Sequence, residues 1–84
     1  MQQTFWHKFL AVPISLTAGS RDELVTLRDA AEFLTSLETW RQRRPHWVHA
    51  GELLLKAGTS GKAKDIDEAT MQMRRALRAE GWLP

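Results

Sequence analysis

The first regular pattern along the chain is an alternation of large apolar residues with proline and hydroxyl residues. Val12, Ile14 and Leu16 follow one another with a period of two, which predicts a strand with these three side chains on one face. Pro13 lies inside this run and has no N–H to donate to a ladder. We therefore expect an edge strand, or one whose Pro13 nitrogen faces away from its neighbour.

A second, shorter strand is predicted at residues 23–26 (ELVT), after a turn at residues 18–21 in which Gly19 is free to adopt a positive φ. The two strands would form an antiparallel hairpin. Because a lone hairpin is only marginally stable in water, this one must pack on another layer.

The rest of the chain repeats apolar residues every three or four positions, which is typical of amphipathic helices. The first predicted helix begins with a capping box formed by Thr26 and Asp29 and runs to about Trp40. The second begins at Pro45, which suits the first turn of a helix, and ends at Gly58.

The third predicted helix starts with a second capping-box-like pair, Asp65 and Glu68, and ends at Gly81. In a Schellman ending, Trp82 would then pack back on Leu77. Within the second helix, Gly51 lowers the helical propensity; close approach of another helix would explain it, or it could simply be tolerated.

These elements predict a single α+β domain of the order ββααα. Residues 9–27 form the hairpin, residues 27–84 form three helices, and residues 1–8 are expected to be a flexible N-terminal segment. Eighty-four residues leave room for one hydrophobic core only. The unpaired edges of a two-stranded hairpin could join in a second copy, giving a four-stranded sheet across a homodimer.

The pattern resembles the alphaproteobacterial family catalogued as domain of unknown function 982, whose members have a short N-terminal hairpin followed by helices. The resemblance covers about Phe9 to Leu83, in the stretches VPISLTAG, LVTLRDAAEFL, HWVHAGELLLKAG and DIDEATMQMRRALRAEGWL. Leu54 stands where such proteins often have a cysteine. Because the family has no established activity, the resemblance implies a fold and no mechanism.

Composition narrows the classes of protein. Hydrophobic residues make up 43% and charged residues 26%, which argues against disorder. With no cysteine there is no disulfide, thiol nucleophile or thiolate metal site, and we expect a cytoplasmic protein. The apolar run from Phe9 to Leu16 superficially resembles a signal peptide, but it is short and broken by Pro13. No run approaches the roughly 20 apolar residues of a membrane-spanning helix.

Candidate catalytic chemistry is sparse. His46, His49 and Glu52 lie at i, i+3 and i+6 of the second helix, but Glu52 only partly shares their face. The sequence has no H-E-x-x-H zinc motif, and GTSGK lacks the full phosphate-loop motif. We therefore predict no catalytic, cofactor-binding or metal-ligating residues. An enzyme or a metal protein is the least favoured hypothesis.

Five arginines are candidates for binding an anionic partner, in a chain with a net charge of +2: Arg41, Arg43, Arg44, Arg74 and Arg78. Phosphate groups of a nucleic acid would suit them, with nearby tryptophans available for stacking. The alternative is a solvated surface or pairing with Glu32, Glu38, Asp67 and Glu80. No helix-turn-helix signature is present.

The favoured hypothesis is a small non-enzymatic interaction domain that homodimerises. Val12, Ile14 and Leu16 are the candidate interface residues, and some of the four tryptophans could lie in the core or anchor an interface. Weak nucleic-acid or anionic-partner binding through the arginines is the second hypothesis, from a different class.

Overall fold

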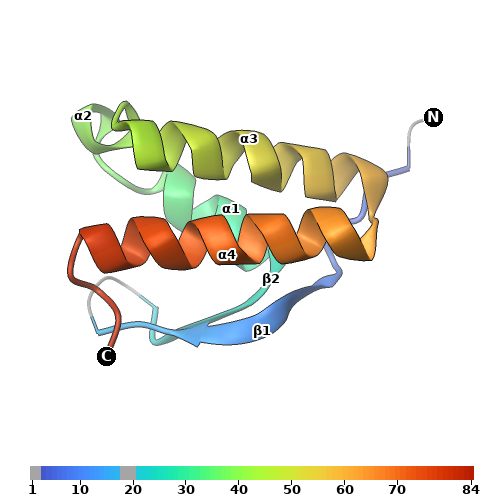
Figure 1. Cartoon of the computed structure of the whole chain (residues 1–84), viewed down its shortest axis with the longest axis horizontal. Coiled ribbons are helices and arrows are strands. Elements are labelled where there is room, and N and C mark those ends of the chain that lie inside the picture. Colours follow the sequence, from blue (N-terminus) through green and yellow to red (C-terminus); the bar gives the residue numbers. More distant parts are fainter. Residues whose placement is uncertain (1–2, 18–20) are drawn as a thin grey trace.

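The computed structural model describes residues 3–17 and 21–84, so most of the predicted turn at residues 18–21 lies outside the described residues. Within them, the elements follow one another as β1 (Phe9–Ser15), β2 (Glu23–Thr26), α1 (Leu27–Thr35), α2 (Thr39–Gln42), α3 (Pro45–Ser60) and α4 (Ala63–Ala79). The predicted α+β fold with an N-terminal antiparallel hairpin is confirmed, with a short additional helix, α2. Figure 1 shows α3 and α4 side by side, with β1 running along α4.

The core lies where the hairpin meets the helices. Ile14 and Leu24, which are cross-strand partners, are completely buried. They belong to one apolar cluster with the buried faces of α1, α3 and α4, including Trp47 of α3 and Met73 of α4. Burial of this kind, at about 25 cal/mol per Å² of apolar surface, is what holds a two-stranded ribbon in place.

The predicted alternation along β1 is interrupted. Phe9 pairs with Thr26 and Ile14 pairs with Leu24, so four residues of β1 lie opposite the single residue Val25. Such an irregularity bends the strand and changes which side chains point inward. Leu10 and Ile14 are therefore buried, whereas Val12, midway between them, is 47% exposed.

The capping box of Thr26 and Asp29 is confirmed at the start of α1. The helix ends at Thr35, earlier than Trp40, which was the predicted end. The Thr35 hydroxyl donates to the Ala31 carbonyl at 3.0 Å, and the Ser36 hydroxyl donates to the Phe33 carbonyl at 2.7 Å. Hydroxyl side chains that bond to the backbone in this way compete with continued helix.

The boundary between α3 and α4 also differs from the prediction. The helix that was predicted to end at Gly58 is α3, and it continues to Ser60. Gly61 follows as its C-cap, with φ +67°. The next helix begins at Ala63, and Asp65 accepts a hydrogen bond from the Ser60 hydroxyl instead of capping the helix. The prediction placed the helix end at the first of two nearby glycines, Gly58, whereas α3 ends at the second, Gly61.

The Schellman ending of α4 is confirmed. Gly81 has φ +76°, and its N–H donates to the Arg78 carbonyl at 3.0 Å. The Trp82 N–H donates to the Leu77 carbonyl at 2.9 Å, which closes the wider ring of the motif. This turn directs residues 82–84 back toward β1.

The segment before β1, for which the sequence predicts flexibility, contacts the helices from Phe5 to Lys8. The Phe5 N–H donates to the Gly58 carbonyl at 2.8 Å, and the Lys8 ammonium donates to the Gly61 carbonyl at 2.9 Å. The Trp6 carbonyl accepts the Arg28 N–H at 2.9 Å. This segment therefore clamps the end of α3 to the start of α1.

Candidate anion-binding groove

The five candidate arginines fall into separate environments. Arg41 and Arg44 both pair with Glu80, whose side chain is only 3% exposed. The Arg44 guanidinium lies 3.0 Å from a Glu80 oxygen, and Trp47 Nε1 approaches the other oxygen at 3.4 Å. Burial opposes ionisation of Glu80, but the hydrogen bonds from Arg41 and Trp47 and the charges of Arg41 and Arg44 outweigh it, so the pKa of this carboxyl is lowered.

The tryptophans near these arginines are used within the chain. The Arg41 guanidinium stacks on Trp40 at 4.4 Å and on Trp82 at 4.9 Å from the ring centroids. Trp82 also contacts the Trp47 ring, at a centroid separation of 6.3 Å. The buried Trp47 and half-buried Trp82 belong to the core region, whereas Trp40 is 52% exposed. Arg41 and Arg44 therefore stabilise the fold.

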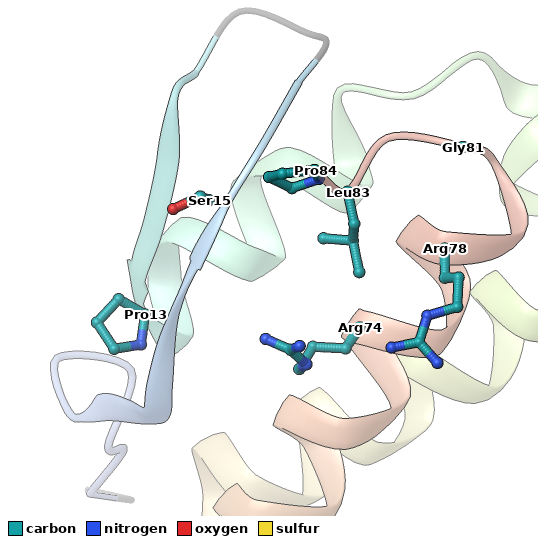
Figure 2. Close-up of a pocket in the computed structure, with 7 residues that line it drawn as sticks. All are labelled: Pro13, Ser15, Arg74, Arg78, Gly81, Leu83 and Pro84. Atoms are coloured by element: carbon teal, nitrogen blue, oxygen red, sulfur yellow. The ribbon is translucent and has the colours of Figure 1, made fainter.

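Arg74 and Arg78 lie elsewhere, one turn apart on α4, and both line a groove of about 350 Å³ between α4 and β1. Figure 2 shows the Arg74 side chain extending from α4 toward the strand, with the Arg78 side chain beside it. The other lining residues come from β1 and from the segment after α4: Pro13, Ser15, Gly81, Leu83 and Pro84.

Neither arginine forms an ion pair in the described part of the chain. Among residues 3–17 and 21–84, no carboxylate oxygen lies within 4.0 Å of either Arg74 or Arg78. By contrast, Arg21 pairs with both Asp29 and Glu32. Like charges at i and i+4 destabilise a helix by roughly 0.2–0.5 kcal/mol, and an anion held between them would relieve that repulsion.

The strand wall of the groove is the outer edge of β1. The Leu16 N–H donates to the Asp22 carbonyl on the hairpin side, and the Thr17 N–H donates outward to the Trp82 carbonyl at 2.9 Å. Because successive residues of a strand alternate in direction, the Ser15 N–H also points outward. It has no hydrogen-bond partner among the described residues. Pro13 lines the same groove, on a strand whose one partner in the described sheet is β2.

The three candidate interface residues differ in accessibility. Ile14 is completely buried inside the chain's own core, so its side chain is not available to a second copy. Leu16 is partly buried against the core, and Val12 is exposed. The sequence missed this division because the irregularity in β1 is not visible in the period-two pattern.

Both outer edges of the hairpin are partly occupied. On β1, the Ala11 N–H donates to the Thr70 hydroxyl at 3.0 Å. On β2, the Val25 and Thr26 N–H groups donate to one Asp29 oxygen at 3.0 and 3.1 Å. Burial raises the pKa of Asp29, but these bonds and Arg21 outweigh it, so its pKa is lowered. Because the Ala11, Val25 and Thr26 N–H groups are already bonded within the chain, less backbone of either strand is available to pair with another strand.

Residues with metal-binding chemistry do not gather. Within the ranges that the structure describes, no group of three or more His, Asp or Glu side chains could hold a metal ion. His49 and Glu52 are exposed, and His46 Nε2 is buried without a hydrogen-bond partner among the described atoms. No helix in those same ranges has the length and apolar character needed to cross a membrane.

Comparison with known proteins adds no relative: no family model matches the chain, and no curated protein or solved structure matches it. The resemblance to domain of unknown function 982 therefore stays a prediction, and the function has to be argued from the residues of the groove.

Proposed function

We propose that this chain is a non-enzymatic binding module that takes up an anionic group of a partner in the groove between β1 and α4. Arg74 and Arg78 supply the charged donors. The observation that carries the proposal is that these two arginines line one groove and have no carboxylate oxygen within 4.0 Å in the described chain, whereas Arg21, Arg41 and Arg44 are each paired.

The chemistry of the groove suits an anion with two or more oxygens. A guanidinium presents several N–H donors in a plane, which matches carboxylate and phosphate groups. An opposite charge at 4 Å gains about 1 kcal/mol in bulk water and about 4 kcal/mol at the effective dielectric constant near a protein surface. Two such contacts in a half-enclosed groove give weak to moderate binding.

The proposal is tested by titrating the isotope-labelled protein with sodium phosphate and sodium acetate and following the backbone amides by NMR. We expect shifts concentrated at Ser15, Arg74 and Arg78. The double variant Arg74→Gln/Arg78→Gln should weaken binding by about tenfold or more, since a charge-assisted contact contributes about 1.5–3 kcal/mol. Arg75→Gln is the matched control, because Arg75 is on the same helix but does not line the groove.

Two results would overturn the proposal: an absence of shifts at millimolar anion, or shifts that persist unchanged in the double variant. Competition with sodium chloride adds a further check, because contacts between exposed charges are screened by salt.

Self-association through the hairpin stays a prediction, which light scattering at micromolar concentration tests. The exposed Phe9 and Val12 favour it, and the occupied edges of both strands oppose it. Nucleic-acid binding through all five arginines also stays a prediction, although Arg41 and Arg44 are already paired with Glu80. The cytoplasmic location expected from the cysteine-free composition is likewise untested.

A further inference from the structure

We infer that the anion is the free α-carboxylate of an extended peptide, whose last residues pair with the open part of β1 while Arg74 and Arg78 hold the carboxylate. This inference rests on the proposed function and names the partner of the same groove. It depends on how the outer edge of β1 is closed at both ends and open between them.

The open part of the edge is short. At one end the Ala11 N–H is taken by the Thr70 hydroxyl, and at the other the Thr17 N–H is taken by the Trp82 carbonyl. At about 3.3 Å per residue, the strand between these contacts spans roughly 20 Å. The Ser15 N–H lies inside this span and faces the groove, and Pro13 has no N–H. One donor and the neighbouring carbonyls can pair with two or three residues of an extended chain.

The closed ends determine which part of a peptide fits. A chain lying along β1 cannot continue past the Thr70 contact at one end or the Trp82 contact at the other. Pairing is therefore limited to two or three residues, a length that suits the end of a chain. The carboxyl end of a peptide carries a negative charge, which two guanidinium groups attract. An amino end carries a positive charge, which they repel.

The same closure disfavours a second copy of the chain as the occupant. In any copy, α4 lies along β1 and the segment after α4 is bonded to it, so that edge cannot be presented as a free strand. A groove of about 350 Å³ accommodates a narrow chain end but not another hairpin with its helix. Pro13 and Leu83 offer apolar contacts to its side chains.

The test compares three unlabelled probes by NMR titration: the peptide acetyl-Ala-Val-Val with a free carboxylate, the same peptide as a carboxamide, and acetate. Valine favours extended backbone, and the acetyl group removes the ammonium charge. We expect the peptide acid to bind about tenfold more tightly than either acetate or the carboxamide, because it gains both the ionic contacts and two or more backbone hydrogen bonds.

Ser15→Pro removes a donor that has no partner among residues 3–17 and 21–84, and it leaves the β1–β2 ladder intact, since the Ser15 N–H points away from β2. In this variant the peptide acid should bind no more tightly than acetate does, so the ratio of the two affinities falls from about tenfold to about one. In case this variant does not fold, hydrogen exchange of the Ser15 amide in the unmodified protein gives a second measurement: the peptide acid should slow it, and acetate should not.

The outcomes separate the two proposals. If the peptide acid binds no better than acetate while acetate binding still requires Arg74 and Arg78, the peptide inference is wrong and the anion-binding function stands. If no probe shifts the groove amides, both are wrong. If a short single-stranded oligonucleotide binds through the same two arginines more tightly than the peptide acid, the partner is a nucleic acid and the peptide inference is wrong.

Discussion

The contact between Trp6 and α3 gives a prediction whose size can be worked from the structure. A Cβ atom added at Gly58 would lie 2.5 Å from the Cε2 and Cζ2 atoms of the Trp6 ring, a separation that requires the ring to move. A Cβ added at Gly51, in the same helix, would meet Leu34 Cδ1 at 3.7 Å, which is ordinary van der Waals contact. The packing around position 51 therefore leaves room for a Cβ atom and does not require glycine there.

The two alanine substitutions should change stability in opposite directions. Replacing glycine with alanine inside a helix gains about 0.8–1 kcal/mol. At Gly51 this gain is nearly unopposed, so we expect Gly51→Ala to stabilise the protein by about 0.5–1 kcal/mol. At Gly58 the overpacking costs about 1–3 kcal/mol, which cancels or exceeds the gain, so Gly58→Ala should destabilise by up to about 2 kcal/mol.

Urea denaturation followed by far-ultraviolet circular dichroism measures both free energies of unfolding. The decisive measurement repeats Gly58→Ala in a Trp6→Leu background, where the obstructing ring is gone. There the substitution should become neutral or stabilising, as it is at Gly51. Equal destabilisation in the two backgrounds would refute the reasoning, because the cost would then not come from Trp6.

Two further predictions concern the contacts that support the groove. Glu80→Gln should destabilise by about 2–3 kcal/mol, because it leaves Arg41 and Arg44 without their buried partner, whereas the exposed Glu38→Gln should change stability by less than about 0.5 kcal/mol. Since the pKa of Glu80 is lowered in the fold, its contribution is complete above the unfolded pKa of roughly 4.3 and is lost as the pH falls below it. Unfolding curves across this range should show a shallower acid loss in Glu80→Gln, and an unchanged slope would contradict the assignment. Thr70→Val leaves the Ala11 N–H without its acceptor, so it should lower the free energy of unfolding by about 1–3 kcal/mol in the same denaturation assay. It should also speed hydrogen exchange of the Ala11 amide, and an unaffected exchange rate would contradict the contact.

Local sequence signals predicted the parts of the fold that depend on neighbouring residues. The capping box of Thr26 and Asp29 and the Schellman turn at Gly81 each need only residues within one turn of each other, and both are confirmed. The boundary at Gly58 was wrong because two glycines within a few residues compete for one helix end. In the fold the Trp6 ring lies against Gly58 and the Phe5 ring against Gly61, and these contacts come from a distant part of the chain that local signals do not reveal.

Contacts between distant parts of the sequence could not be predicted in this way. Arg41 and Arg44 meet Glu80 across 39 and 36 positions, and nothing in their own neighbourhood distinguishes them from Arg43. Ser15 likewise has no local signal for its place in the groove, since its role follows from α4 lying along β1. The sequence identifies five arginines as candidates for anion binding, but only the packing of the fold shows which of them are paired with carboxylates.

One local signal does mark Arg74 and Arg78. On a helix, a carboxylate three or four residues away is the natural partner of an arginine. Besides each other, Arg74 and Arg78 have six residues at these spacings, and none of them is acidic: Thr70, Met71, Arg75, Leu77, Gly81 and Trp82. Glu80 is closer in sequence, two residues from Arg78, but two residues turn a helix by about 200°, so it faces away from the groove and pairs with Arg41 and Arg44. The end of α4 thus separates its charges, with the acid turned toward the connector before α3 and two arginines turned toward β1. Placing an acid among the residues that line the groove is therefore the most direct way to fill the site from within: Ser15→Asp should weaken acetate binding while leaving the Glu80 contacts unchanged.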